Sequence, residues 1–396
     1  MAEPRKPGSP QEPDDRSLID TVRLAQCVGM SRGPIASHPI RSMIVLSLIA
    51  WLPPLVLSFA EGRALSGIGI PFLVDFPTAV RSLLVIPLLL FAQTLLRRVL
   101  PRIVEHLETS GLIRESDRAR YESAKEQAVE ARDSRAAKLI VLGIVFGLAY
   151  LNLVRPVHIN PNSWIADPSG PAFGRSAAGL WQALVAAPIY SYLVVEWLRR
   201  IAIWDRFLFH VSRFDLKLVG SHPDRAGGLG FLSFGQAAFG TVLFALSAGF
   251  AASVAGRILF EHDELETHLP VIITVVLIEI LAILLPLFFF GPVLRRGRRK
   301  AWMDYAHLAG RQSQAFAGHW LGKRPPDDEE LRASPDVSTT TDMAGVFDVV
   351  AEMGPNALLK RTGIAVAGPA IIPFLPLALT VVPLSEILKA LAGLVL

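Results

Sequence analysis

Long apolar stretches alternate along the chain with shorter polar connections. Seven of them are long enough to cross a bilayer, because a helical span needs about 20 mostly apolar residues for a hydrocarbon core of ~30 Å. They lie at about 43–60, 82–100, 138–154, 178–198, 232–256, 269–293 and 363–383. Each run is continuously apolar rather than alternating, which argues against a transmembrane β-barrel. The pattern predicts an all-α fold, a polytopic transmembrane helical bundle of about seven spans.

The two ends of the chain differ from this core. Residues 1–41 are polar and proline-rich, so we interpret them as a disordered tail without a cleavable signal peptide. Residues 42–396 then form a single integral-membrane domain. The last stretch is crowded with prolines, which favour a broken or re-entrant helix: Pro369, Pro373, Pro376 and Pro383. The segment Ser385–Leu396 is too short to cross and is predicted to lie at the interface as a helix capped by Ser385.

Basic residues are concentrated in alternate connections. Of the 39 Lys and Arg residues, 33 lie in the N-terminal segment and in the second, fourth and sixth connections. Cytoplasmic connections of membrane proteins carry the excess of Lys and Arg. We therefore predict a cytoplasmic N-terminus and a periplasmic C-terminus. The net charge of +4 reflects this topology and does not indicate a nucleic-acid partner.

Three basic connections have the composition of helices rather than of linkers. We predict that membrane helices are prolonged into the cytoplasm at about 101–137, 199–225 and 295–360, and pack there as a helical layer. Ser116–Lys138 contains no Gly or Pro and runs directly into the third span, which predicts one continuous helix. The sixth span is likewise predicted to continue into the helix that follows it.

A glycine-rich turn precedes the fifth span in the segment SHPDRAGGLGF. Glycines that open a helix present free N–H groups to an anion, and an Arg adds a bidentate donor. One hypothesis is a site for an anionic lipid headgroup or a phosphate-bearing ligand. The alternative is a tight turn whose polar side chains bond locally. The candidate residues are His222, Asp224, Arg225, Gly227, Gly228 and Gly230.

Glu279 is an acidic residue near the middle of the sixth span. A charge at the bilayer centre costs about 2.5–3.5 kcal/mol on insertion scales, so such residues rarely face lipid and are often functional. One interpretation is proton or cation coupling. The other is a hydrogen-bonded side chain that packs against a polar neighbour such as Gln93, Thr241 or Ser247.

Other chemistry is weakly indicated. The connection at 261–268 holds four carboxylates and two imidazoles, but their spacing matches no closed metal motif. No nucleophile motif and no particular cofactor is indicated, which leans against an enzyme. Cys27, the single cysteine, excludes an internal disulfide framework. Small residues recur along the fifth span, which favours close helix packing inside the protein or, alternatively, a homo-oligomer interface.

A glycine-rich segment and a C-terminal pattern of two parts, all in the second half of the chain, are similar to known sequences. GSHPDRAGGLGFL, combined with SPDVSTTTDMAGVFDVVAEM and the proline-rich LPLALTVVPLSEILKALAGLVL, resembles a group of bacterial multi-pass inner-membrane proteins. The resemblance implies the architecture and a location in the bacterial inner membrane. It implies no activity.

These observations leave three functional hypotheses. The leading one is transport or ion permeation, with Glu279 as the coupling or pore-lining group. The second is a non-catalytic sensor or scaffold that binds a cytoplasmic partner or anionic lipid through the cytoplasmic helices and the glycine-rich turn. A membrane-embedded enzyme is the weakest.

Overall fold

The computed structural model describes residues 39–66, 68–154, 160–167, 169, 173–321 and 336–378. Within these residues the chain is helical, with two isolated β-bridges and no extended strand. Seven helical segments are long and apolar enough to cross a membrane, which confirms the predicted multi-pass, all-α architecture. They are Pro39–Ala60, Phe76–Thr109, Arg135–Val154, Ala177–Val211, Leu232–Phe260, Leu265–Phe289 and Pro355–Leu377.

Several spans are built from more than one element. The first six spans comprise α3 (Pro39–Ala60), α4 (Phe76–Val80) with η1 (Arg81–Val85) and α5 (Ile86–Thr109), α7 (Arg135–Val154), α8 (Ala177–Trp181) with η3 (Gln182–Ala186) and α9 (Ala187–Val211), α10 (Leu232–Ala237) with α11 (Gly240–Phe260), and α12 (Leu265–Phe289). The seventh comprises α16 (Pro355–Ile371), η4 (Ile372–Phe374) and α17 (Leu375–Ala378). Both η1 and η3 are π-helical.

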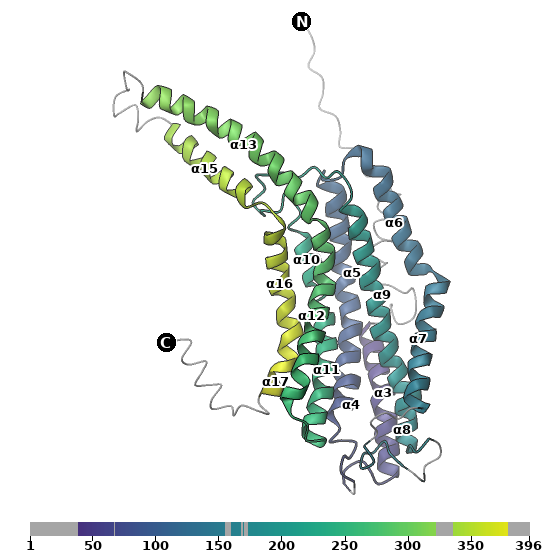
Figure 1. Cartoon of the computed structure of the whole chain (residues 1–396). Helices are drawn as coiled ribbons and strands as arrows, with labels where there is room; N and C mark the ends of the chain where they lie inside the picture. The colour runs from purple at the N-terminus through teal and green to yellow at the C-terminus, as the bar shows by residue number, and fades with distance from the viewer. Residues whose placement is uncertain are drawn as a thin grey trace, which may run out of the picture.

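The spans form a bundle in which α11 is central (Figure 1). Of the seven, α11 and its neighbour α10 have by far the largest buried share. Glycines of α11 allow neighbouring residues to approach closely. A Cβ added at Gly240 would lie 3.0 Å from Pro369, one at Gly249 would lie 3.1 Å from the Tyr190 hydroxyl, and one at Gly256 would lie 2.8 Å from Pro77. The predicted close internal packing of this span is confirmed.

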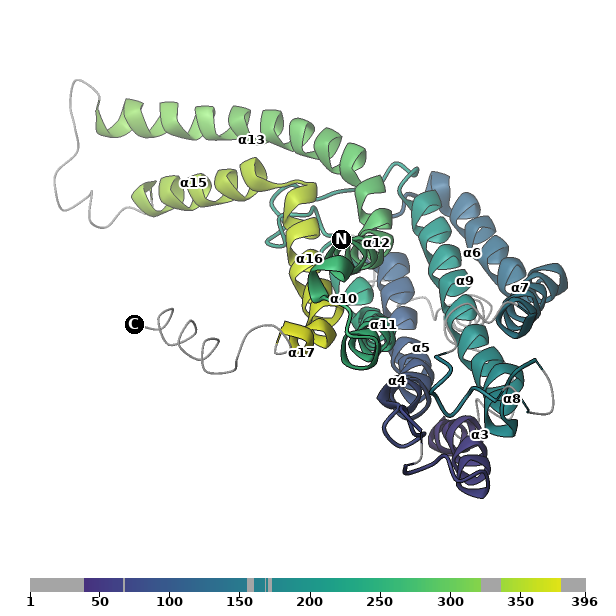
Figure 2. The same ribbon diagram turned by 60° about the horizontal axis from the view of Figure 1, so that its bottom comes forward.

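Two helices leave the bundle at one end as a projecting arm (Figures 1 and 2). The arm consists of α13 (Gly291–Trp320) and α15 (Asp336–Glu352), which pack along each other. We call the end that carries them the arm end. The opposite end, which carries the connections 61–75, 160–167 and 173–176, is the loop end.

Two predicted continuous helices are interrupted. The first breaks at Ser134 between α6 (Arg118–Asp133) and α7, because Ser134 leaves the helical region with ψ 118° and its Oγ accepts the backbone N–H of Ala137 at 3.2 Å. The second breaks at Phe290 between α12 and α13. At the first break, Ser134 is well suited to cap the start of α7. The high helix propensity of the flanking residues therefore did not indicate that α6 and α7 are separate helices.

The chain ends match the predictions only in part. The helix α3 begins at Pro39, inside the range assigned to the polar tail, and residues 1–38 lie outside the described residues. In the last span the α-helix gives way to a 3₁₀ turn at Ile372–Phe374, which has Pro373 as its middle residue, so the predicted proline break is present. The expected end of this span at 383 and the interfacial helix at Ser385–Leu396 lie outside the described residues.

Candidate functional site

An apolar cleft lies between the spans formed by α3, α5, α7 and α9. Its volume is about 310 Å³, and Leu and other apolar side chains of all four helices line most of it. The lining includes Leu46, Leu90, Leu142, Val145, Phe146 and Leu193. Four polar side chains complete the wall: Gln93, Arg97, Tyr192 and Arg200. The cleft is therefore amphiphilic, with a long apolar surface and two guanidinium groups.

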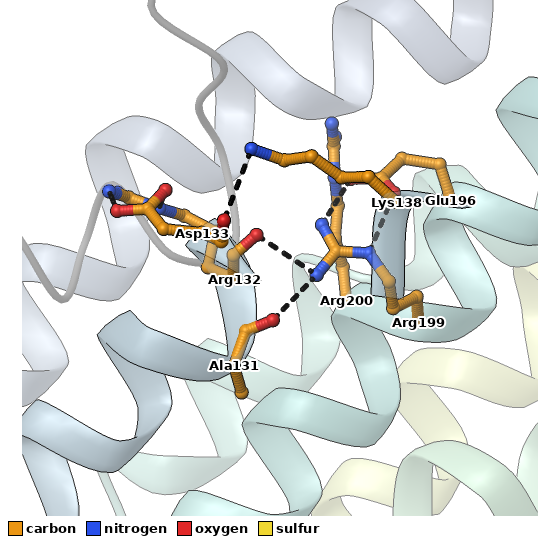
Figure 3. Close-up of polar contacts among 7 residues, drawn as sticks. All are labelled: Ala131, Arg132, Asp133, Lys138, Glu196, Arg199 and Arg200. Atoms are coloured by element: carbon orange, nitrogen blue, oxygen red, sulfur yellow. Dashed lines mark hydrogen bonds and ion pairs between the residues drawn. The ribbon is translucent and has the colours of Figure 1, made fainter. Parts of the chain in front are cut away.

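A buried ion-pair cluster lies beside the cleft on α9 (Figure 3). Glu196 is 8% exposed and Arg200 is 5% exposed. The Glu196 carboxylate accepts from Arg199 Nη2 at 2.6 Å and Nε at 2.8 Å, and from Arg200 Nε at 3.0 Å. Glu196 therefore pairs with both arginines that follow it on α9. The spacing of three and four residues places all three groups on one helix face.

Arg199 connects this cluster to the break between α6 and α7. Its Nη1 donates to the backbone carbonyls of Ala131 at 3.3 Å and Arg132 at 3.4 Å, in the last turn of α6 (Figure 3). Beyond the break, Lys138 Nζ donates to the Asp133 carbonyl at 3.5 Å. Cations are favourable at a helix C-terminus, where the last carbonyls lack intrahelical partners. The cluster thus holds the broken helix against α9.

Arg200 retains unused hydrogen-bonding capacity. Its guanidinium stacks over the ring of Trp197 at 5.1 Å, and Trp197 Nε1 in turn donates to the Leu89 carbonyl at 3.1 Å. Its Nη1 is buried and has no hydrogen-bond partner among the described residues. Because an unpaired buried donor costs about 1–3 kcal/mol, such a group gains from an acceptor that enters the cleft.

The charges around this end of the cleft are predominantly positive. The charged residues that line the cleft are Arg97 and Arg200, and the adjoining cluster adds the guanidinium of Arg199 and the carboxylate of Glu196. An anionic head with an apolar tail matches this distribution, because the head meets the arginines and the tail meets the apolar lining. The arrangement is suited to binding an amphiphilic anion.

Glu279 lies on α12 at the contact with α11. The Ser247 hydroxyl donates to its Oε2 at 2.6 Å, so one of the neighbours named from the sequence is its partner. Ser247 is fully buried and Glu279 is half-buried. The Tyr190 hydroxyl packs against α11 at Gly249. The Glu279 side chain therefore has the hydrogen-bonded helix contact of the second interpretation, and coupling stays a prediction.

The glycine-rich turn closes around its own carboxylate. Asp224 accepts the backbone N–H groups of Ala226 at 2.8 Å, Gly228 at 3.2 Å and Gly230 at 2.7 Å. Gly227 and Gly228 have φ values of 66° and 96°, which only glycine adopts without strain. The donors that the anion hypothesis would offer to a ligand are occupied internally. An external anion would have to displace Asp224, and the local bonding of the alternative is present.

The same turn supports the base of the arm. Arg225 forms an ion pair with Glu352, the last residue of α15, and its carbonyl accepts the N–H of Gly354 at 3.0 Å. His222 Nδ1 lies 2.8 Å from Asp224 Oδ1. Of the six candidate residues, Asp224 and the glycines thus shape the turn, and Arg225 joins it to the arm.

The acidic connection after α11 contains one close pair, His268 Nε2 to Asp263 Oδ2 at 3.1 Å. Within the part of the chain that the structure describes, no group of three or more His, Cys, Asp or Glu side chains is arranged to hold a metal ion.

The sequence did not reveal the cleft. Arg97 and Arg200 lie on different spans, each at the end of an apolar stretch of the sequence, where basic residues also serve as topological anchors. No spacing along the chain connects them. The signal that was present is Glu196, an acidic residue close to a membrane interface. In comparisons with known proteins, no family model, curated protein or solved structure matches this chain.

Proposed function

We propose that this multi-pass membrane protein binds an anionic lipid in the cleft between α3, α5, α7 and α9, and acts as a membrane-embedded sensor or scaffold. The observation that carries the proposal is the buried Nη1 of Arg200, unpaired among the described residues, at the wall of an otherwise apolar cleft. A lipid phosphate supplies the missing acceptor, and its acyl chain fills the apolar part.

The charge pattern along the chain supports the location of this site. The connections richest in Lys and Arg meet at the arm end, which we propose is cytoplasmic by the positive-inside rule. The proposed orientation places the N-terminus inside and the C-terminus outside, and the membrane is the bacterial inner membrane. The arm then projects from the cytoplasmic face, where it offers a surface to a cytoplasmic partner. A homo-oligomer stays a prediction.

Lipid selectivity tests the proposal. The full-length protein is equilibrated with phosphatidylglycerol and phosphatidylcholine of identical acyl chains, and retained lipids are counted by native mass spectrometry. We expect preferential retention of phosphatidylglycerol, and a loss of about tenfold in Arg97→Gln, since a hydrogen bond to a charged group contributes about 1.5–3 kcal/mol.

Arg98→Gln is the matched control, because Arg98 is the exposed neighbour of Arg97 on the same helix. It should retain phosphatidylglycerol as the wild type does. Leu142→Trp, which fills the cleft without changing charge, should lower the retention of both lipids. Equal retention of the two lipids by the wild type, or equal losses in the Arg97 and Arg98 variants, would contradict the proposal.

Ion or proton conduction through Glu279 is the second candidate function. The observation that favours it is the hydrogen bond between Ser247 of α11 and Glu279 of α12, with the Tyr190 hydroxyl of α9 packed against α11 at Gly249. Fully buried apolar side chains such as Val242 and Leu243 lie on α11 toward the arm end. Conduction therefore requires a second conformation, which lipid binding does not.

Proton flux into proteoliposomes under an imposed pH gradient tests this candidate. If Glu279 conducts, Glu279→Gln abolishes a flux that the wild type shows, because the amide cannot exchange a proton. Glu266→Gln, in the first turn of the same helix and exposed, should leave the flux unchanged. A wild type without flux above protein-free vesicles, or a Glu279→Gln variant with full flux, removes conduction from consideration.

A further inference from the structure

A second, polar cavity lies at the loop end of the bundle, away from the cleft. Its volume is about 380 Å³, and its wall is formed by α4, η1, η3, the last turns of α11 and the connection between α7 and α8. Ligand pockets begin at about 300 Å³, whereas a water molecule occupies about 30 Å³ of liquid volume. The cavity therefore has room for a small solute.

Arg175 is the central group of its wall. It is 4% exposed, and its Nη2 donates to the backbone carbonyl of Asn152 at 2.6 Å and to the Asn152 side chain at 3.0 Å. These bonds hold the guanidinium against the end of α7. Its Nε is buried and has no hydrogen-bond partner among the described residues. Burial lowers the pKa of Arg175 because it removes water from the charged guanidinium. An anion beside it would offset this desolvation cost.

Gln182 offers the complementary group. Its Oε1 is buried without a hydrogen-bond partner in the described part of the chain, and Gln182 is the first residue of the π-helix η3. Arg81, also on the cavity wall, is the first residue of the π-helix η1 and donates to Ser253 at 2.7 Å. Single π-turns inside helices recur at functional sites, since the extra residue turns a side chain out of the helical register.

Among the described residues of the wall, the fixed charges leave one positive charge in excess. Three guanidinium groups, of Arg81, Arg175 and Arg257, face the carboxylates of Asp75 and Glu261. Asp75 already accepts from the Thr78 hydroxyl at 2.7 Å and from Trp164 Nε1 at 2.8 Å. Glu261 is exposed. In the part of the wall that the structure describes, the buried groups without a hydrogen-bond partner are thus one cationic donor, Arg175 Nε, and one neutral acceptor, Gln182 Oε1.

We propose that this cavity binds a small oxyanion that also carries an O–H donor, of the size of hydrogen phosphate or a short hydroxycarboxylate. One anionic oxygen accepts from Arg175 Nε, and the hydroxyl donates to Gln182 Oε1. Arg175 and Gln182 specify the ligand together. An anion without an O–H donor leaves Gln182 Oε1 unpaired, and a neutral donor leaves Arg175 Nε unpaired. The proposal is independent of the lipid cleft, which shares no lining residue with this cavity. On the orientation proposed above, the cavity faces the periplasmic side.

Two pairs of probes that each differ by one O–H test the proposal by calorimetry on the full-length protein in nanodiscs. Hydrogen phosphate and sulfate are compared at mildly alkaline pH, where both are tetrahedral dianions. Glycolate and acetate, both monoanions, form the second pair and distinguish a phosphate ligand from a carboxylate ligand. We expect the hydroxyl-bearing member of at least one pair to bind at least about tenfold more tightly, because a buried acceptor left unpaired costs about 1–3 kcal/mol.

Two variants assign the effect to the two groups. Arg175→Gln should lower the affinity for the preferred probe at least about tenfold, as expected for the loss of a charge-assisted bond. Gln182→Leu should abolish the preference within the pair while binding of the weaker probe persists, a result that general misfolding cannot produce. Arg98→Gln at the arm end is the charge-matched control and should bind as the wild type does.

Three outcomes would overturn the proposal. They are no saturable binding of any of the four probes, equal affinities within both pairs, and a preference that survives Gln182→Leu. The first means that water alone fills the cavity, and the second means that any anion of the right size enters it.

Discussion

Glu196→Gln is expected to lower the free energy of unfolding by about 3–5 kcal/mol, because removing one partner of a buried ion pair leaves an uncompensated charge. Arg200 is 5% exposed and cannot reach water without a change in packing. The substitution also releases Arg199, which fixes the break between α6 and α7. Unfolding of the reconstituted protein in a denaturing detergent, followed by tryptophan fluorescence, measures the loss.

The double variant Glu196→Leu/Arg200→Leu distinguishes an orphaned charge from a packing defect. Replacing both partners of a buried pair by apolar residues is often neutral, so the double variant should regain most of the stability lost in Glu196→Gln. Glu126→Gln, an exposed substitution on α6, should change stability by less than about 0.5 kcal/mol. A double variant that is less stable than Glu196→Gln would show that the charge itself is not the cause.

The seven spans followed from the sequence because their physical cause is local. Each helix satisfies its own backbone groups in lipid, so length and hydrophobicity decide its existence without knowledge of its neighbours. The break at Ser134 was missed because its competing bonds come partly from elsewhere: Arg199, some 65 residues away, takes the last carbonyls of α6. The helix propensity of Ser116–Lys138 depends only on its own residues and cannot reveal the contact with Arg199.

The candidate sites show the same division. Asp224 and the glycines around it form a local motif. The sequence therefore predicted the turn, together with the two alternatives of an anion site and a locally bonded turn. The cleft and the polar cavity are assembled from separate spans: Arg97 with Arg200 in one, Arg175 with Gln182 in the other. Their defining property is a buried polar atom left unpaired among the described residues, which depends on packing and has no counterpart in residue order. Glu279 was recognised from its depth, yet only the packing of α11 against α12 identified Ser247 as its partner.

Asp224→Ala is expected to cost about 3 kcal/mol and to loosen the base of the arm. The substitution leaves the backbone N–H groups of Ala226, Gly228 and Gly230 without the carboxylate that now accepts them, and bonds to a charged acceptor are among the stronger ones. The turn then loses the shape that holds Arg225 against Glu352 and Gly354. Asp215→Asn is the control: Asp215 is an exposed aspartate of the same connection, and its surface ion pair with Arg114 should contribute less than about 1 kcal/mol.

Acidification of the wild type should destabilise the glycine-rich turn, as Asp224→Ala does, because it protonates the Asp224 carboxylate. Burial alone would raise the pKa of Asp224, but the N–H donors of Ala226, Gly230 and Gly228, together with His222, outweigh it and hold that pKa below its usual range. A carboxyl with a depressed folded-state pKa adds stability that is fully present above its unfolded pKa of about 3.9 and is lost as the pH falls through the folded value. Protection of the amides at 226–230 from hydrogen exchange, measured relative to the intrinsic exchange rate at each pH, should therefore fall below about pH 4. In Asp224→Ala this protection should be low at every pH. Exchange at these amides that is equally slow in the variant would mean that the glycine backbone, rather than the carboxylate, holds the turn closed.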